Sequence, residues 1–295
     1  MPLRIQAGAR GGAAAILDRD RDYRRVRSRS GLAARRRAVQ VALGVTWLLD
    51  AALQFQPYMF TKAFVRDAIL STAPGNPDIV ARPIIWAAKL MLGHIVVANA
   101  TFATLQLALA LGLFWRPAVR MALAASIAWS LAVWWLGEGF GGVLTDNFDP
   151  FGGAPGAAVL YVVVALLAWP RPESEPDPHV GCVAETSPLG RFGARTAWTV
   201  LWAGLGCAAL LPDTRSAHGT YLVAVLAALC GVAAVAVASG RLARLGVVAA
   251  VVAGVAIWVV QGFGELLAGQ ATDPNSGPLL ILIAAAFWPV ARGPR

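Results

Sequence analysis

The sequence has little charge, little histidine and little cysteine. Asp, Glu, Lys and Arg together make up 14% of the 295 residues, whereas apolar residues make up 58%. Soluble domains are typically about 25% charged and about 45–50% apolar. The composition therefore excludes a soluble enzyme, a disordered chain and a fibrous repeat. The 30 glycines and 11 tryptophans instead fit a membrane interior with interfacial aromatic side chains.

The motifs of the common enzyme sites are also missing. No glycine-rich loop is followed by the Gly-Lys of a nucleotide-binding loop, no Ser-His-Asp set can be proposed, and the His-Glu-x-x-His zinc signature is absent. The three cysteines form neither a disulfide framework nor a Cys-x-x-Cys pair. They are Cys182, Cys207 and Cys230. Any chemistry must therefore come from a few isolated polar residues.

Most of the positive charge lies in residues 1–37. The net charge is +9, and this segment alone carries eleven arginines against three aspartates. We expect it to be a disordered cytoplasmic tail whose arginines orient the first helix, or one that also contacts anionic lipid headgroups. Because the rest of the chain is nearly neutral and no aromatics interleave with the arginines, we expect no nucleic-acid partner.

Eight apolar segments approach the ~20 residues that a helix needs to cross the hydrocarbon layer. They are residues 38–56, 94–115, 118–136, 154–170, 196–212, 219–239, 244–261 and 277–290. With the N-terminus inside, 20 of the 25 basic residues fall on the cytoplasmic side. The sequence therefore predicts a multi-pass protein of the inner (plasma) membrane with both termini cytoplasmic. Segment 57–71 is expected on its outer surface, and segment 83–93 is expected to be an interfacial or re-entrant helix that leads into the second span.

The two halves of the chain resemble each other. Residues 135–141 read W-L-G-E-G-F-G, and residues 258–264 read W-V-V-Q-G-F-G. Further matches follow in order. They are Asp149-Pro150 with Asp273-Pro274, Pro155 with Pro278, and Trp169-Pro170 with Trp288-Pro289.

The fold class expected from this repetition is an all-α membrane protein with eight transmembrane helices arranged as two parallel four-helix repeats. An even number of spans gives both halves the same orientation, so a pseudo-two-fold axis along the membrane normal should relate them. The predicted units are the tail 1–37, the repeats 38–170 and 195–295, and a cytoplasmic linker 171–194.

The stretch 105–135 includes Q-L-A-L-A-L-G-L-F-W-R-P-A-V-R and then a further apolar span. It resembles the central helix pair of a DoxX-type four-helix unit, a family that includes the DoxD-type subunit of thiosulfate:quinone oxidoreductase. The whole chain also resembles uncharacterised two-repeat membrane proteins of actinobacteria. The DoxX resemblance implies a four-helix bundle in each half and membrane redox chemistry, but it carries over no catalytic residue.

Two histidines occupy equivalent repeat positions. His94 lies 26 residues before Arg120, and His218 lies 26 residues before Arg244. With Glu138 and Glu265 they could form an outer-face site, and His94 and His218 are the candidate ligands of a transition metal. The alternative is two interfacial histidines that bond to loop backbone or water, beside glycine-rich turns that only pack helix ends.

Asp50 and Gln261 complete the set of binding candidates. Asp50 lies inside the first span, where an acid is costly and is by default a functional candidate. We expect it to face protein or water, with Lys89 or Gln54 as its first polar neighbour. The alternative is a purely structural hydrogen bond or ion pair. Gln261 is the repeat equivalent of Glu138.

These residues favour an outer-face site between the repeats that binds a quinone, a metal or a small redox partner. The cofactor would then be a quinone or a transition metal, and the partners would be the lipid bilayer and a membrane redox protein. A second reading is a small-solute or ion transporter with a path between the halves and Asp50 as coupling group. A third is a non-catalytic membrane partner subunit.

Overall fold

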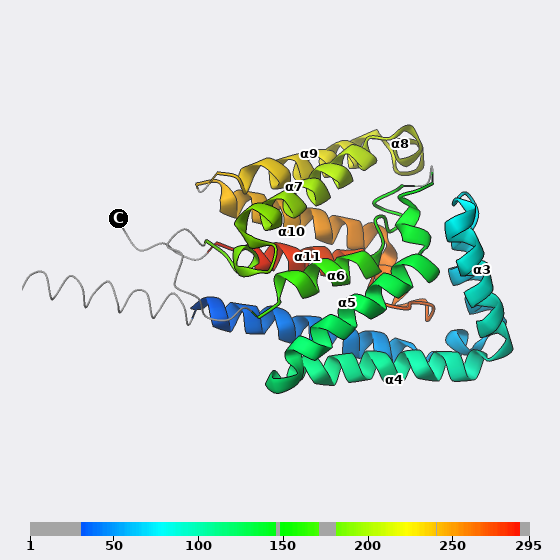
Figure 1. The fold of residues 1–295 in the computed structure, drawn as a ribbon. Coiled ribbons are helices and arrows are strands. Elements are labelled where there is room, and N and C mark those ends of the chain that lie inside the picture. The colour runs from blue at the N-terminus through cyan, green and yellow to red at the C-terminus, as the bar shows by residue number, and fades with distance from the viewer. Residues whose placement is uncertain (1–30, 146–147, 171–180, 240, 290–295) are drawn as a thin grey trace, which may run out of the picture.

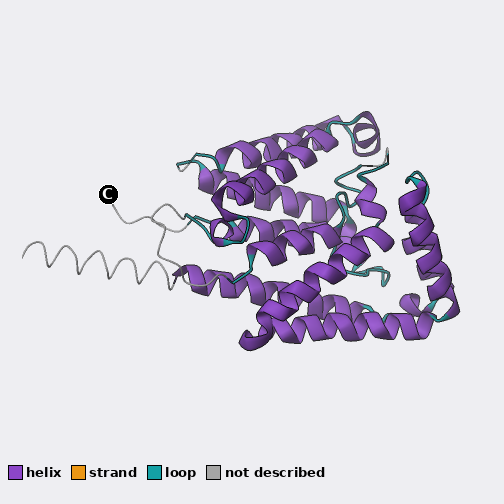
Figure 2. Cartoon of the chain, in the orientation of Figure 1, coloured by secondary structure: helices purple, strands orange, loops and turns teal. Residues whose placement is uncertain are grey.

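The computed structural model describes residues 31–145, 148–170, 181–239 and 241–289. Every regular element in these ranges is helical, which confirms the all-α prediction at that level (Figure 2). Most of the predicted tail and residues 171–180 of the predicted linker lie outside the described residues.

All eight predicted apolar segments lie on helices. The helices that carry them are residues 31–53, α4 (Ile95–Phe114), α5 (Val119–Leu136), α6 (Ala157–Leu167), α7 (Gly190–Ala209), α9 (Thr220–Ala236), α10 (Ala243–Val260) and α11 (Ser276–Ala286). Two boundaries differ from the prediction. Residues 31–37 of the predicted tail are helical, and α7 begins inside the predicted linker because its sequence continues the helical pattern upstream of Arg195.

These helices differ in length and hydropathy. In the described part of the chain, three segments are long and apolar enough to cross a membrane: Ile95–Phe114, Arg116–Leu136 and Ala243–Val260. A fourth would be the pair of α7 and α8 (Pro212–His218), which is bent by 67°. Helices α6 and α11 have 11 residues each. At about 1.5 Å per residue each covers only about half of the ~30 Å hydrocarbon layer.

The two short helices, α6 and α11, lie side by side at the centre of the bundle (Figure 1). Helix α5 packs on α6 and α10 packs on α11, while α7 and α9 form an outer pair. Nearly every side chain of α6 and α11 is apolar, and a helix that is apolar on all sides is buried. The main core therefore runs along these two helices.

A second, smaller core lies at one end of the bundle, where helix α3 (Asp78–Gly93) runs across the long helices (Figure 1). Short helices in residues 57–72 pack against it. They are η1 (Pro57–Phe60), α2 (Lys62–Phe64), η2 (Val65–Ile69) and η3 (Leu70–Thr72). The buried side chains of this core include Met59, Phe64, Ile84 and Met91. Both segments that the sequence assigned to a surface are amphipathic here: they bury this apolar face and expose Lys62 and Lys89.

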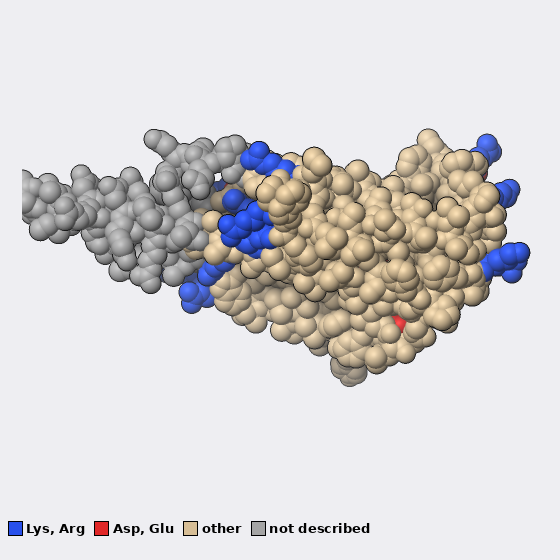
Figure 3. Space-filling view, turned by 90° about the horizontal axis from the view of Figure 1, so that it is seen from below, with Lys and Arg blue, Asp and Glu red and all other residues tan. Residues whose placement is uncertain are grey.

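Charged side chains gather at the two ends of the long axis, and few lie between them on the face shown in Figure 3. Large apolar side chains are exposed between the ends. They include Val45, Leu48, Val97, Leu111, Met121 and Val252. Such a belt is what a protein shows where lipid rather than water surrounds it.

The Gly-Phe-Gly motif adopts the same backbone conformation at both of its occurrences. Phe140 in η5 (Gly139–Gly142) has φ 60°, and Phe263 in η7 (Gly262–Glu265) has φ 59°. A Cβ on Gly141 would collide with the carbonyl of Pro155, and one on Gly264 would lie 2.8 Å from the carbonyl oxygen of Pro274. The structure therefore pairs Pro155 with Pro274. The sequence matched Pro274 with Pro150 and Pro155 with Pro278, so these contacts agree with neither match, because the first loop is longer.

Candidate functional site

A cavity of about 600 Å³ lies between helix 31–53, α3, α4 and α5. Aromatic side chains make much of its wall. They are Trp47, Phe64, Trp86, Phe102, Trp129 and Tyr161. A cavity of this size, mainly apolar and with a few polar groups, is typical of a small-molecule site. Residues 64–69 and Tyr161 of α6 complete the wall, so segments from residue 47 to residue 161 and the loop residues Thr272 and Asp273 meet only in the folded bundle.

Asp50 lies at the polar side of this cavity. Its side chain is 1% exposed, and its Oδ2 accepts a hydrogen bond of 2.5 Å from the hydroxyl of Tyr161 on α6. The expectation that Asp50 faces protein rather than lipid is confirmed. Its neighbour is nevertheless Tyr161 and not Lys89, which is exposed on α3. Gln54, the other expected neighbour, lines the same cavity.

Glu138 connects the end of α5 to the beginning of α6. Both of its carboxylate oxygens accept the backbone N–H of Ala158, at 3.0 and 3.2 Å. This N–H belongs to the first turn of α6, where backbone donors have no partner within the helix and where the helix dipole favours an anion. Burial, and secondarily the nearby Asp273, still raise the pKa of Glu138 to about 8. Glu138 is therefore largely protonated at neutral pH.

Asp273 is the third acid of the cavity. Its Oδ1 accepts the backbone N–H of Asn275 at 2.7 Å, and its Oδ2 accepts the hydroxyl of Thr272 at 2.9 Å. Burial raises the pKa of Asp273 despite these two hydrogen bonds. No Lys or Arg is among the described residues that line the cavity. The three acids therefore either hold protons or receive a positive charge from a ligand.

Five buried polar atoms of residues that line the cavity have no hydrogen-bond partner. They are Asp50 Oδ1, Gln54 Oε1, Gln106 Oε1, Trp129 Nε1 and Ser130 Oγ. Nearly all buried polar groups in proteins are hydrogen-bonded, so a cluster of unpaired ones needs an explanation. Water or a ligand with donors and acceptors of its own would supply the missing partners.

A second cavity, of about 740 Å³, adjoins the first and is lined mostly by loop residues. Both cavities are lined by Glu138 and Asp273, so these two acids lie where the cavities meet. Gln261 and Glu265 line only the second cavity. Gln261 donates to Ser276 Oγ at 3.0 Å, so it contacts the beginning of α11 much as Glu138 contacts that of α6. The glycine-rich loops thus form a polar vestibule beside the apolar cavity.

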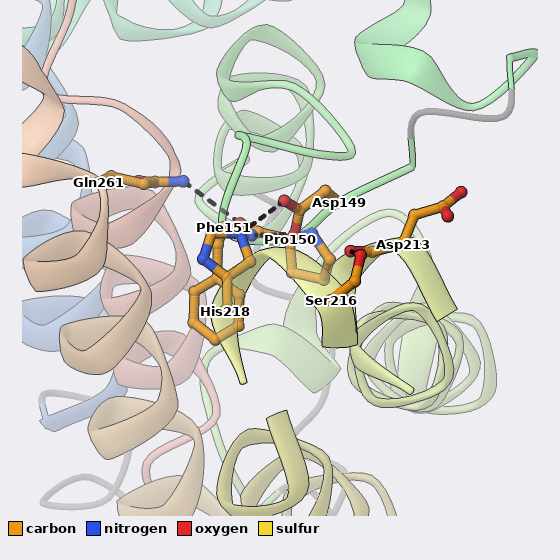
Figure 4. A network of polar contacts seen from close by, with 7 residues as sticks. All are labelled: Asp149, Pro150, Phe151, Asp213, Ser216, His218 and Gln261. Carbon is orange, nitrogen blue, oxygen red and sulfur yellow. Dashed lines mark hydrogen bonds and ion pairs between the residues drawn. The ribbon is translucent and has the colours of Figure 1, made fainter. Parts of the chain in front are cut away.

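The two repeat-equivalent histidines have different surroundings. His94 lines the apolar cavity at the corner between α3 and α4. His218, at the end of α8, has its Nε2 2.9 Å from Asp149 Oδ2 and its ring against Phe151 (Figure 4). In Figure 1 the α3–α4 corner and α8 lie at opposite sides of the bundle. The structure therefore does not bring His94 and His218 together.

The structure gives no support to a metal centre. The part of the chain that it describes contains no group of three or more His, Cys, Asp or Glu side chains that could hold a metal ion. Helices α4 and α9, which begin next to the two histidines, do not form the centre of the bundle, because α6 and α11 lie there (Figure 1). The histidines are consequently at the periphery.

Sequence reasoning missed several residues of the cavity. Tyr161 and Asp273 were not chosen as site residues, although Asp273 stood in the matched Asp-Pro pair. Ser130 is buried on α5 and Gln106 is buried on α4, and both line the cavity. A polar residue inside an apolar span is a sequence signal for a functional site. The criterion that selected Asp50 would therefore also have selected the buried polar residues of α4 and α5.

The chain has no match among the protein-family models, the curated proteins or the solved structures with which it was compared.

Proposed function

We propose that the chain is an inner-membrane protein with both termini in the cytoplasm, built from two four-helix repeats of DoxX type. The apolar belt supports a place in a membrane. The orientation is supported by the basic residues, 20 of 25 of which fall on the side predicted to be cytoplasmic. The paired Gly-Phe-Gly turns and the central contact of α6 with α11 support the repeats. In this arrangement α3 lies along the outer membrane surface.

The cavity beside Asp50 is proposed to bind a ring-bearing amphiphile of the quinone class. The observation that carries this proposal is the coincidence of an aromatic-walled cavity of about 600 Å³ with five unpaired buried polar atoms. Aromatic side chains stack on a planar ring, and the unpaired groups would bond its oxygens. Exposed side chains of α3 and α4, such as Trp86 and Val97, line this cavity and would place its entrance toward the lipid.

The acids give this site a route for protons. Reduction of a quinone takes up two electrons and two protons. Glu138 and Asp273, which lie where the cavity meets the vestibule, could pass protons from the outer aqueous side to the bound ring. A membrane redox partner would exchange the electrons. In this view the chain supplies binding and proton transfer, and Asp50 with Tyr161 orients the ligand.

The second candidate function is transport of a small solute or ion. The observation that favours it is the same pair of adjoining cavities, because together they connect the interior near Asp50 to the polar end of the bundle. Three acids without a basic partner on this path could bind a lipophilic cation, since aromatic walls also attract cations. The charge of the ligand separates the two candidates.

Tryptophan fluorescence tests the proposal, because Trp47, Trp86 and Trp129 line the cavity. We expect decylubiquinone to quench the tryptophan fluorescence of the purified protein in nanodiscs, and we expect this quenching to reach saturation. Ala98→Phe fills the cavity and should weaken this binding at least about tenfold, or about 1.4 kcal/mol. Ala100→Phe, on the exposed side of the same helix, is the control.

The possible outcomes are distinct. Equal quenching of both variants would exclude this cavity as the quinone site. Saturable quenching by tetraphenylphosphonium but not by the quinone, together with its proton-coupled uptake into proteoliposomes, would favour the transporter instead.

A further inference from the structure

A group of arginines surrounds a cavity at the end of the bundle opposite to Asp50, Glu138 and Asp273. This cavity has a volume of about 450 Å³ and lies between helix 31–53, the turn that begins α5 and Pro170. Its charged lining residues are Arg36, Arg37, Arg116 and Arg120. No acid is among the described residues that line it. Figure 3 shows basic side chains gathered at this end.

Two of these arginines are held in place by neutral partners. Arg37 donates to the carbonyl oxygens of Leu113 and Phe114 at 2.7 and 2.6 Å, which satisfies carbonyls left free at the end of α4. Arg36 donates to Thr186 Oγ1 at 2.6 Å, and its buried Nε has no partner. The guanidinium groups are therefore positioned without neutralisation of their charge.

The other two arginines are free to bind. Arg116 and Arg120 are exposed and make no ion pair or hydrogen bond in the part of the chain that the structure describes. Four guanidinium groups around one cavity repel each other, and an anion between them removes this cost.

A cavity at the same end of the second half is also lined by arginines and a proline, but one of its lining residues is an acid. It has a volume of about 280 Å³, and Arg195, Arg241 and Arg244 line it together with Pro289. Glu185 also lines it, with a side chain that is 3% exposed.

Glu185 forms an ion pair with Arg195 in this smaller cavity, and its Oε1 also lies 3.8 Å from Nε of Arg191. Its Oε1 accepts Nε of Arg195 at 2.8 Å and lies 2.7 Å from the NH2 nitrogen of the same guanidinium. Its Oε2 accepts the backbone N–H of Gly181 at 2.6 Å. The sequence places Arg195 and Arg244 as Arg37 and Arg120 are placed in the first half. A carboxylate of the chain itself therefore occupies one of two similarly built arginine cavities.

We propose that the cavity lined by Arg36, Arg37, Arg116 and Arg120 binds a phosphate group, in the place that the Glu185 carboxylate takes in the other half. Guanidinium groups match the oxygens of a phosphate through paired hydrogen bonds. The phosphate comes either from the headgroup of an anionic phospholipid or from free phosphate in solution. This inference does not depend on which ligand occupies the aromatic cavity.

Thermal unfolding in detergent tests the site with two probes. Dioleoylphosphatidylglycerol should raise the melting temperature more than dioleoylphosphatidylcholine does, because a ligand that binds only the folded state stabilises it. The double variant Arg116→Gln/Arg120→Gln should lose at least about half of this rise. Arg82→Gln/Arg215→Gln, which removes two arginines from the other end of the molecule, is the matched control. A rise with inorganic phosphate alone identifies the free anion as the ligand, and a rise with the phospholipid alone identifies the headgroup.

A gain of binding provides the sharper test. Glu185→Gln removes the internal anion. If the thermal shifts identify the headgroup as the ligand, native mass spectrometry should show a second retained phosphatidylglycerol in this variant where the wild type retains one. Arg116 and Arg120 are exposed, so the Arg116→Gln/Arg120→Gln variant should fold normally. It should retain no phosphatidylglycerol. No thermal shift with either probe would overturn the proposal. A shift with the phospholipid together with an unchanged number of bound lipids in that double variant would overturn it as well.

Discussion

The Tyr161 hydroxyl donates a hydrogen bond of 2.5 Å to Oδ2 of Asp50 and thereby joins α6 to helix 31–53. The ring of Tyr161 also lies against Trp47, with 4.3 Å between the ring centroids. Asp50 Oδ1 is left without a partner. The same pair of residues therefore closes one side of the cavity and leaves an acceptor available to a ligand.

Tyr161→Phe removes this hydrogen bond and leaves the Asp50 carboxyl group without a protein partner. We expect the free energy of unfolding to fall by about 1–3 kcal/mol, because the buried group then pays its desolvation cost in full. Tyr221→Phe is the matched control, since Tyr221 is 91% exposed. Equal stability of the two variants in thermal unfolding would show that the contact contributes nothing.

Glu138 makes the stability of the protein depend on pH. Its pKa is about 8 in the folded state against 4.5 for a free glutamate. Between these values the folded protein binds a proton that the unfolded chain releases, so stability is greatest below the lower value and falls as the pH rises through the higher one.

Melting temperatures measured from about pH 5 to about pH 9 test this dependence. The wild type should lose stability over the range, and Glu138→Gln should flatten the curve while it keeps an oxygen acceptor for Ala158. Asp273→Asn should flatten it further, because the pKa of Asp273 is raised by burial as well. The exposed Glu265→Gln serves as control, and an equally steep curve for Glu138→Gln would contradict the prediction.

The glycines of the Gly-Phe-Gly turns should not tolerate a side chain. Gly141 and Gly264 have φ of 60° and 70°, and a Cβ on either would press against a proline carbonyl. We expect Gly141→Ala and Gly264→Ala each to lower the free energy of unfolding by about 1–3 kcal/mol. The alanine would have to adopt a positive φ, and its Cβ would overlap the proline carbonyl. Gly231→Ala, in the middle of α9 with open space around it, should instead stabilise by about 0.5–1 kcal/mol. Urea or thermal unfolding of the three variants decides the point.

Single cysteines test the proposed orientation. In a background with Cys182, Cys207 and Cys230 replaced by Ala, Arg82→Cys should react with a membrane-impermeant maleimide in intact cells. Arg120→Cys should react only after the membrane is broken, because arginine-rich ends stay on the cytoplasmic side. Labelling of Arg120→Cys but not of Arg82→Cys in intact cells would show that the proposed orientation is wrong.

The sequence by itself determined that the chain is helical, that it is rich in apolar spans, and where its charged ends lie. These features depend on local composition and hydropathy, and both can be calculated from one amino-acid sequence. It also marked Asp50 and Glu138, because an acid in or beside an apolar span is rare and expensive to bury. The repeated Gly-Phe-Gly was visible as well, since its left-handed turns need glycine on both sides of the phenylalanine.

Only the tertiary structure decided which faces of the helices meet. An apolar helix with no polar stripe gives no sign of its orientation, so the sequence could not show that α6 and α11 are central and that His94 and His218 are peripheral. For the same reason Tyr161 could not be assigned to Asp50, nor Asp273 to Glu138. The members of each pair lie more than a hundred residues apart in the sequence, and only packing brings them to the same cavity.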